Sequence, residues 1–231
     1  MLSRGGKLIK SIFCGPLKLI ALGAEAALYR TCFEDLDALV KVRLPKPYRD
    51  PTLDKMLRSR RTELEGKILA ELRLKGLKVP ALYYVNLENA LLIMEFIEGL
   101  TLRDLVFMKG GQVTKYFKYW GVFTALMHET GIVHGDLTTS NVIVKDEEIY
   151  VVDFGLAKYS NKVEDRATDI HLMIRAVEST HYTVKEALLK AFSEGYKEVL
   201  GEQTFKELLE KVKEIRMRGR YVEERRMRKN I

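Results

Sequence analysis

Residues 17 to 44, 82 to 86 and 91 to 97 are rich in apolar residues, among them β-branched and aromatic ones, with a few polar residues between them. Such runs, bounded by turn residues, predict β-strands. In "LKLIALGAEAALYR" the run is interrupted at Gly23, which predicts two strands joined by a tight turn. A second turn is expected at "EDLD", just before "ALVKVR". The front of the chain is therefore predicted to be a β-sheet.

A long helix is predicted in "YRDPTLDKMLRSRRTELEGKILAELRLKG". Asp50 can cap it, Pro51 takes its first position, and Gly76 ends it. Its buried face is expected from the aliphatic residues that recur at helical spacing, Leu53, Leu57, Leu64, Ile68 and Leu72.

From about residue 101 the pattern becomes helical. One helix is expected over roughly residues 112 to 130, ending before Gly131, and three more follow residue 155. The break in pattern near Ile97 to Leu100 predicts a boundary between two lobes. Residues 1–97 would form a β-rich N-lobe that binds a nucleotide, residues 98–215 a helical C-lobe, and residues 216–231 a basic tail.

The composition is that of a globular protein, because 47% of the 231 residues are hydrophobic. Cys14 and Cys32 are too few for a disulfide framework or a zinc site, so we expect two buried small hydrophobic residues and a reducing, cytoplasmic setting. No pair of histidines has metal-ligand spacing.

The first residues carry basic side chains before an apolar stretch, as a signal peptide does. Gly15, Pro16 and Lys18 interrupt that stretch, so no signal peptide is expected. No apolar run along the chain is long enough to cross a bilayer.

Positive charge is concentrated in two places. Residues 211 to 231 hold nine Lys or Arg against three Glu, and residues 41 to 61 hold eight basic against two acidic residues, while the whole chain carries +7. Such patches favour a polyanionic partner, nucleic acid first and ATP second. A solvated, frayed helix end is the alternative interpretation of the tail.

A buried cation is predicted on the last strand before the long helix. Lys41 lies in the middle of "ALVKVR", where alternation turns it inward between apolar neighbours, and a lysine so placed needs an anion. Glu65 and Glu63 are the candidates on the helix. We prefer Glu65, because it shares a helical face with Ile68 and Leu72.

Three polar residues are close in "HGDLTTSNVIVKDEEIYVVDFG". Asp136 and Asn141 are five residues apart in a loop, and the hairpin that follows returns the chain to Asp153. Asn141 and Asp153 offer oxygen ligands suited to Mg²⁺. Asp136 is then free to orient the hydroxyl that accepts a phosphoryl group.

Each of these signals is weak alone, but their order along the chain is that of the protein-kinase signature set. The chain resembles the protein-kinase-like superfamily over nearly its whole length, which implies an α+β, two-lobed fold that binds ATP and Mg²⁺. In "MEFIEG" the resemblance places adenine near Glu95 and Ile97, beneath Met94. The phosphate loop would be "ALGAEAALY", with Gly23, Ala24 and Glu25 and a single glycine.

Several differences from ordinary protein kinases indicate which family of the superfamily this chain resembles. Gly135 replaces the arginine of the catalytic loop, and after "DFG" the chain reaches "EDRATDIHL" with no room for an activation segment. With "GAEA", "KPYRDPTLD", "RRTELEG" and "RMRGR", these features resemble the small atypical serine/threonine kinase and ATPase of the KEOPS complex, the PRPK family, with an archaeal source expected. The resemblance implies the large KEOPS subunit that forms threonylcarbamoyladenosine in tRNA, and other KEOPS subunits, as partners, and a tail that faces tRNA or that large subunit.

Other interpretations remain. A small-molecule kinase of the aminoglycoside or choline type also uses His-Gly-Asp, but usually has a larger helical lobe. RIO kinases are a neighbouring family whose loops differ from "DLTTSN". A binding module that holds ATP or tRNA without chemistry is a third possibility. Whether the working reaction is protein phosphorylation or ATP hydrolysis is left open.

Overall fold

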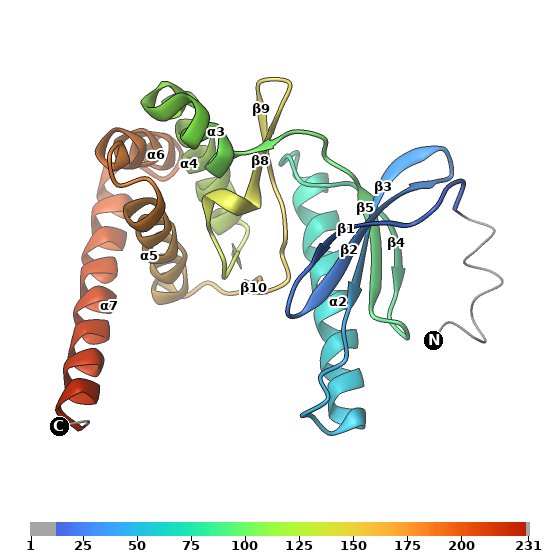
Figure 1. The fold of residues 1–231 in the computed structure, drawn as a ribbon. Helices are drawn as coiled ribbons and strands as arrows, with labels where there is room; N and C mark the ends of the chain where they lie inside the picture. Colours follow the sequence, from blue (N-terminus) through green and yellow to red (C-terminus); the bar gives the residue numbers. More distant parts are fainter. Residues whose placement is uncertain (1–12, 230–231) are drawn as a thin grey trace. The chain divides into compact units, whose positions relative to one another are not determined.

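The protein divides into two compact units, with the boundary between Glu98 and Gly99. The structure is a computed structural model that describes the backbone of residues 13 to 229 and the side chains of residues 13 to 218. Figure 1 shows the sheet and long helix of the first unit and the helices of the second.

The first unit contains a five-stranded antiparallel sheet with the order β1-β2-β3-β5-β4. Its strands are β1 (Lys18–Leu22), β2 (Ala26–Phe33), β3 (Leu36–Arg43), β4 (Leu82–Asn86) and β5 (Leu91–Glu95). Glu34 and Asp35 join β2 to β3 with positive φ angles of 47° and 65°, as a two-residue hairpin requires. The strands expected from the sequence are confirmed.

The long helix α2 (Pro51–Leu74) begins and ends where the sequence predicted. The Asp50 carboxylate accepts hydrogen bonds from the backbone N–H groups of Thr52 and Leu53, and Gly76 follows the last turn with a φ of 80°.

The expected buried face of α2 is right only from Ile68 onward. Ile68 and Leu72 are buried, whereas Leu53 is 45% exposed and Leu57 and Leu64 are half-buried. The turns before Ile68 instead bury polar side chains, Asp54, Thr62 and Glu65. Ion pairs made by the two carboxylates offset their loss of hydration, so charge rather than apolar periodicity sets this part of the helix.

The two faces of the sheet differ in character. Residues on one face of β3 point toward α2, and the residues between them, including Ala38 and Val40, pack with Phe33, Leu91 and Ile93 on the other. This alternation leaves the α2 side of β3 for Lys41 and Arg43.

The second unit is mainly helical. Its helices are α3 (Leu102–Lys109), α4 (Thr114–Glu129), α5 (Val163–Thr180), α6 (Lys185–Leu200) and α7 (Glu202–Lys229), with short 3-10 helices η1 (Gly110–Val113) and η2 (Thr139–Asn141). The predicted helical back of the chain is confirmed. None of the helices in the described part of the chain is both long and apolar enough to span a membrane.

Helices α4 and α6 cross at very close range because glycine lies at the crossing (Figure 1). A Cβ atom on Gly121 would lie 2.0 Å from the carbonyl oxygen of Phe192, and one on Gly195 would lie 1.9 Å from that of Lys118. Trp120, Phe192 and Tyr196 fill the core around this crossing.

Short strands complete the second unit. The hairpin β8 (Val142–Lys145) and β9 (Glu148–Val151) was expected, and β6 (Leu100–Thr101) extends it to three strands. A separate pair, β7 (Ile132–Val133) and β10 (Lys158–Tyr159), was not expected, because strands of two residues have no periodicity to read.

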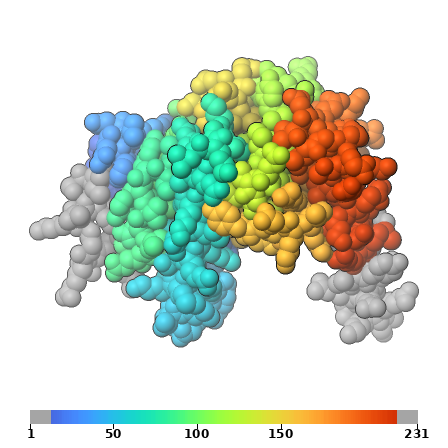
Figure 2. All heavy atoms as spheres, turned by 180° about the vertical axis from the view of Figure 1, so that it is seen from behind, coloured from blue at the N-terminus to red at the C-terminus, as the bar shows by residue number. Residues whose placement is uncertain are grey.

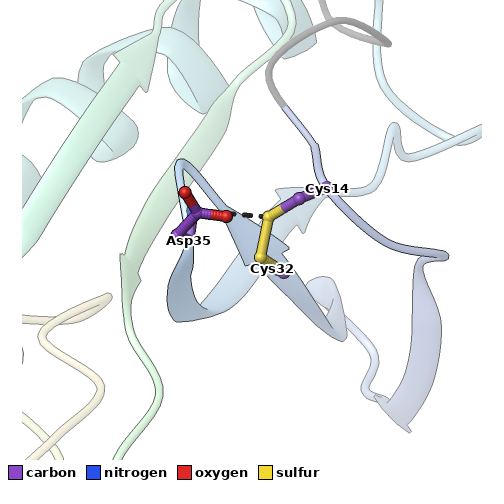
Figure 3. A group of neighbouring side chains, drawn as sticks. All are labelled: Cys14, Cys32 and Asp35. Carbon is purple, nitrogen blue, oxygen red and sulfur yellow. Dashed lines mark hydrogen bonds between the residues drawn. A yellow bond between two sulfur atoms is a disulfide. The ribbon is translucent and has the colours of Figure 1, made fainter.

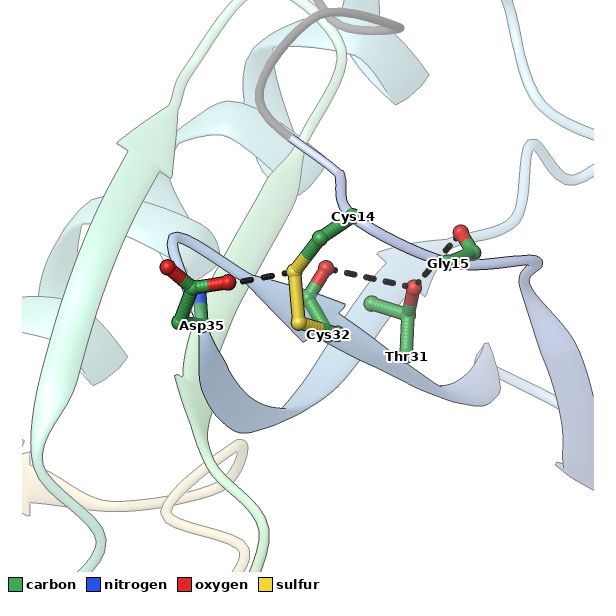
Figure 4. Close-up of a disulfide and its surroundings, with 5 residues drawn as sticks. All are labelled: Cys14, Gly15, Thr31, Cys32 and Asp35. Atoms are coloured by element: carbon green, nitrogen blue, oxygen red, sulfur yellow. Dashed lines mark hydrogen bonds between the residues drawn. A yellow bond between two sulfur atoms is a disulfide. The ribbon is translucent and has the colours of Figure 1, made fainter.

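The expectation for the two cysteines is wrong. Cys14 and Cys32 form a disulfide with a Cα–Cα distance of 5.2 Å, and Cys14 is exposed rather than buried (Figure 4). The Cys14 N–H donates to the carbonyl of Cys32 over 3.2 Å, and the Thr31 hydroxyl donates to the carbonyl of Gly15. Backbone pairing therefore brings the two sulfur atoms together. The inference of a reducing compartment loses its basis.

The disulfide also excludes a metal at this position. The sulfur atoms and a carboxylate oxygen of Asp35 lie within 4.8 Å of one another (Figure 3). Sulfur atoms bonded to each other cannot act as thiolate ligands, so this group is a crosslink and not a metal site.

Reducing the disulfide should destabilise the protein. A bond that closes a loop of this length, 18 residues in sequence separation, restricts the unfolded chain and contributes about 3 kcal/mol. We expect a reductant to lower the free energy of unfolding in urea by roughly that amount in the native chain. The variant Cys14→Ser should unfold like the reduced chain and show no response to the reductant. Two free thiols in protein purified under oxidising conditions would contradict the crosslink.

Candidate active site

In the first unit, the candidate residues surround a buried carboxylate shared by two cations. Glu65 on α2 is 1% exposed. Lys41 Nζ donates to its Oε1 over 2.6 Å, and Arg43 Nη2 donates to its Oε2 over 2.6 Å. Lys41 and Arg43 are two residues apart on β3 and so point to the same face of the sheet. One carboxylate therefore holds two cations in a nearly dry environment.

The rival carboxylate has another partner. Glu63 accepts a hydrogen bond from Lys67 on the outer surface of α2, and that ion pair lowers the pKa of Glu63. The expected pair of Lys41 with Glu65 is thus the pair that forms. Its role in catalysis stays a prediction.

The predicted phosphate loop is held from α2 and from the connection that precedes α2. The Glu25 carboxylate accepts a hydrogen bond from Arg61 over 2.8 Å, and Lys46 Nζ donates to the carbonyl of Ala24. Within the loop, the Gly23 N–H donates to the carbonyl of Ala26 over 2.9 Å. Cations from residues 46 to 61 thus restrain a loop that has a single glycine.

In the predicted adenine segment, part of the backbone is already engaged. The Glu95 N–H donates to the carbonyl of Ala81 over 2.8 Å, and the Phe96 N–H donates to the carbonyl of Asp37 over 3.2 Å. The Met94 and Ile97 side chains are buried. The carbonyl of Glu95 and the N–H of Ile97 are then the backbone groups that could receive a base.

In the C-terminal unit, the candidate residues Asp136 and Asn141 are in contact. Asn141 Nδ2 donates to the carboxylate of Asp136 and to its backbone carbonyl, each over 2.9 Å. The fold of the loop therefore orients the Asp136 carboxylate. Since Asn141 Nδ2 is the donor, its Oδ1 is the atom that could bind a metal.

Asp153 follows the hairpin in a conformation that costs energy. Its φ is 61°, in the left-handed region that residues other than glycine rarely adopt, and its carboxylate accepts a hydrogen bond from the Gly155 N–H over 3.2 Å. The Val152 N–H donates to the carbonyl of Asn141 over 2.9 Å, which ties the two segments together. An amide oxygen and an exposed carboxylate match the oxygen ligands that Mg²⁺ prefers.

Asp169 on α5 anchors the catalytic loop, and the sequence did not single it out. Its carboxylate is 1% exposed and accepts hydrogen bonds from the N–H groups of His134, over 2.6 Å, and Gly135, over 2.8 Å. Charge-assisted bonds from two successive amides fix the backbone just before Asp136.

A buried chain of hydrogen bonds continues from Asp169. His128 Nε2 lies 3.2 Å from the Asp169 carboxylate, and His128 Nδ1 lies 2.8 Å from the Tyr196 hydroxyl. Burial lowers the pKa of His128, although Asp169 opposes that shift, and burial raises the pKa of Tyr196. At neutral pH these hydrogen bonds therefore connect the neutral imidazole of His128 and the neutral phenol of Tyr196 to the carboxylate of Asp169.

The structure explains the glycine in the catalytic loop. Gly135 has a φ of 79°, and a Cβ atom at this position would lie 2.4 Å from the carbonyl oxygen of Leu156. Both the backbone angle and the contact exclude a side chain here. The arginine of ordinary kinases could not occupy this position without moving residue 156.

Arg43 and Asp169 are the site residues that the sequence analysis missed. The signal for Arg43 was present, because alternation on β3 places it on the face of Lys41. Asp169 had no comparable signal. It lies on a helix of ordinary periodicity, and only the tertiary structure shows which amides its carboxylate meets.

Comparison with known proteins gives a consistent family. The RIO domain model matches residues 29–181. The KEOPS complex subunit Bud32 of Pyrococcus abyssi is 40% identical over 214 residues, covering 90% of this chain and 97% of that protein. The EKC/KEOPS complex subunit bud32 of Dictyostelium discoideum is 36% identical, covering 87% of this chain and 82% of that protein.

Some relatives are much longer. A probable bifunctional tRNA threonylcarbamoyladenosine biosynthesis protein of Methanocaldococcus jannaschii is 36% identical over 208 residues, and this chain spans 38% of its length. Among solved structures, the Rio2 kinase-ADP/Mg²⁺-phosphoaspartate complex from Chaetomium thermophilum aligns over 93% of this chain and 74% of that one, with a TM-score of 0.63 and 12% identity. The latter likeness shows a shared kinase-like fold.

Adding a methyl group at residue 135 should disrupt the catalytic loop. We expect Gly135→Ala to lower the free energy of unfolding by more than the roughly 1–2 kcal/mol that a left-handed alanine costs, because the Leu156 carbonyl must also move. The matched control is Gly76→Ala, where φ is 80° and no atom lies within 4 Å of the added Cβ. Urea unfolding of both variants measures the difference. Equal losses of stability would show that the contact with Leu156 is of no consequence.

Proposed function

The chain belongs to the RIO-domain family of atypical kinases and, within it, to the Bud32 family, and we propose that it is an ATP-dependent phosphotransferase and ATPase that works as a KEOPS subunit in forming threonylcarbamoyladenosine in tRNA. The observation that carries the proposed chemistry is the Asp136 carboxylate, oriented by Asn141 in a loop that Asp169 anchors. This arrangement suits a group that orients an acceptor hydroxyl.

Membership in the RIO-domain family corrects one expectation and disfavours another. We treated the RIO kinases as a neighbouring family, whereas the RIO domain model matches this chain itself. A small-molecule kinase of the aminoglycoside or choline type is not favoured, because the similarity to Bud32 extends over 90% of the chain.

Asp136 would act on the incoming nucleophile. A bond forms between the attacking oxygen and the γ-phosphorus, the bond from the γ-phosphorus to the β–γ bridging oxygen breaks, and Asp136 accepts the proton that the nucleophile loses. With water as the nucleophile the products are ADP and phosphate. With a serine or threonine hydroxyl of a partner, they are ADP and a phosphoprotein.

Residues of the first unit would hold the nucleotide. Lys41, positioned by Glu65, supplies a cation for the phosphates, and Gly23, Ala24 and Glu25 form the loop above them. The carbonyl of Glu95 and the N–H of Ile97 would hydrogen-bond adenine, and Met94 would pack near it.

Mg²⁺ would be bound by Asn141 Oδ1 and the Asp153 carboxylate, and when bound it neutralises charge on the phosphates. The support is the donor chemistry of these two residues. The fold neighbour Rio2 has been solved with ADP and Mg²⁺, which is consistent with the same cofactors here.

Hydrolysis of ATP is the reaction that the second unit favours. Only residues 156 to 162 separate "DFG" from α5, and β10 ties them to β7. A segment this short offers no platform for a substrate peptide. We therefore propose ATP turnover as the main activity, with serine or threonine phosphorylation limited to a bound partner.

Partners follow from the relatives. The names of two relatives describe them as KEOPS subunits, and we propose that this chain also binds the large KEOPS subunit, other KEOPS subunits and tRNA. The proposed action on tRNA supports a cytoplasmic location. The two cysteines do not support it, because they form a disulfide. The basic tail, residues 216 to 231, is proposed to contact tRNA or the large subunit.

Replacing the catalytic carboxylate should abolish turnover. We expect Asp136→Asn to lower the rate of ATP hydrolysis by about 10²- to 10⁴-fold while nucleotide binding persists, because the proton acceptor is lost and the fold is not. Phosphate release and labelling of protein are measured together, with Mg²⁺, with and without the large KEOPS subunit and tRNA. Stimulation by both partners is expected.

A matched control is available in the same segment. Asp146 is exposed in the turn between β8 and β9 with a φ of 49°, and asparagine tolerates that conformation. Asp146→Asn should keep wild-type turnover. If Asp136→Asn also turns over ATP at the wild-type rate, the chain is a binding module. Efficient transfer to an unrelated small molecule, without any effect of partner or tRNA, would refute the KEOPS assignment.

Deleting residues 216 to 231 should weaken tRNA binding without unfolding the protein. The apolar side chains that α7 buries, Phe205, Leu208 and Val212, lie before the deletion. The deletion removes the ion pairs of Arg216 with Glu178 and Arg218 with Glu164, which are surface pairs worth at most about 1 kcal/mol each. Circular dichroism melting checks the fold. Affinity for tRNA that is unchanged at both low and moderate salt would contradict the role of the tail.

A further inference from the structure

A strongly basic pocket lies in the first unit between the predicted phosphate loop, the end of β3 and the first half of α2. Figure 2 shows the segment around residue 50 at the surface of this unit. The pocket has five basic residues and one acidic residue in its wall, which consists of Glu25, Arg43, Leu44, Lys46, Arg49, Leu57, Arg58 and Arg61. The proposed catalytic residues do not require this concentration of positive charge, and an anion is the kind of ligand that it favours.

Arg43 gives the pocket an unsatisfied donor. It is 4% exposed, its Nη2 is bound to Glu65, and its Nε is buried and has no hydrogen-bond partner within the described part of the chain. A buried donor without a partner is costly, and a ligand that accepts a hydrogen bond would remove that cost. The ligand of this pocket is therefore an acceptor as well as an anion.

The acidic residues nearby do not neutralise the cations. Asp54 accepts a hydrogen bond from Arg58 over 2.7 Å and lies 3.7 Å from Arg49, so one carboxylate serves two guanidinium groups. These contacts lower the pKa of Asp54, with Arg58 as the main cause. An excess of positive charge is left in the wall, which a phosphate group would balance.

An aromatic side chain beside the pocket favours a polynucleotide over a free anion. Tyr48 is 75% exposed, and the Arg49 guanidinium lies 5.5 Å from the centre of its ring. An exposed ring next to a phosphate-binding cation is the combination that single-stranded nucleic acid uses, because the base stacks while the backbone is neutralised.

The basic surface continues along α2. A second hollow shares Leu57 and Arg61 with the pocket, and its other lining residues are Arg60, Glu63, Leu64 and Lys67. A chain of phosphates could therefore follow the helix from one hollow to the next. A single small anion in the pocket would not contact this second group of basic residues.

We propose that this pocket binds a backbone phosphate of a single-stranded segment of RNA, with an adjacent base stacked on Tyr48. The proposal rests on the proposed function, because that function supplies RNA as the partner. The site is formed by other residues than the basic tail, and it shares only Glu25 of the phosphate loop with the proposed nucleotide site.

The test measures binding of a fluorescent single-stranded RNA of about 12 nucleotides to the full chain by anisotropy. We expect Tyr48→Ala to weaken binding about fivefold or more, and Tyr48→Phe to bind like the wild type, because a phenylalanine ring still stacks. Arg49→Ala should weaken binding about tenfold and reduce its dependence on salt.

Lys75→Ala is the control for the loss of one positive charge. Lys75 is the C-cap of the same helix and does not line either hollow. This variant should bind RNA almost as tightly as the wild type. Equal weakening by Lys75→Ala and Arg49→Ala would show that only net charge matters and would overturn the site. Unchanged binding in both Tyr48→Ala and Arg49→Ala would overturn it as well.

Tripolyphosphate distinguishes the two sources of phosphate. At constant ionic strength it should displace the RNA from the wild type, and a duplex of the same length should bind more weakly than the single strand. If Arg49→Ala loses affinity for tripolyphosphate but keeps full affinity for RNA, the pocket is a site for free polyphosphate and the RNA assignment is wrong.

ATP turnover by the isolated chain separates this proposal from the proposed function. Tyr48→Ala should leave that turnover unchanged. Suppose that RNA binding depends on Tyr48 but that the chain shows no ATP turnover dependent on Asp136. This result would refute the proposed function and support the RNA site in the pocket. Normal turnover together with RNA binding that ignores Tyr48 and Arg49 would refute the pocket alone.

Discussion

A charge removed from water must be paired, and the candidate residues of each unit depend on this constraint. Glu65 in the first unit and Asp169 in the second are each 1% exposed. Glu65 is paired with two cations, and Asp169 with two backbone amides and a histidine. Removing any partner would leave part of a buried charge uncompensated, so each carboxylate fixes the segments that meet it. The active-site geometry follows from these two anions more than from apolar packing.

In the second unit, a short stretch of chain and a few contacts hold the predicted catalytic loop in place. Asp169 accepts hydrogen bonds from the backbone of the loop, and Asn141 donates to the Asp136 carboxylate. Gly135 has a left-handed backbone conformation, which lets the loop pass close to Leu156. Ordinary kinases have both an arginine at the position of residue 135 and a long activation segment, because the arginine binds a phosphate group on that segment. In this chain Gly135 and a short segment take these places, and contacts with Asp169 and Asn141 hold the loop.

Much of the fold could be predicted because its signals are local. Runs of apolar, β-branched and aromatic residues located the strands, and Asp50, Pro51 and Gly76 marked the ends of α2. The same local rules chose the wrong face for the first turns of α2, since Leu53 and Leu57 obey the helical period while Asp54 is buried by Lys46, Arg49 and Arg58. Asp169 and the disulfide were missed for a related reason. Each depends on residues far apart in sequence, which no local pattern records.

The distribution of charge around Glu65 connects the nucleotide loop with the basic pocket. Glu65 serves both Lys41 and Arg43, so one carboxylate sets the position of two cations on the same face of β3. The wall of the pocket around Arg43 holds four more cations, and its nearby carboxylates are already engaged, Glu25 with Arg61 and Asp54 with Arg58 and Arg49. Clustered cations repel one another, and a phosphate group is a ligand that reduces this repulsion. The carboxylate that holds Lys41 for the proposed nucleotide therefore also holds Arg43 in the wall of the basic pocket.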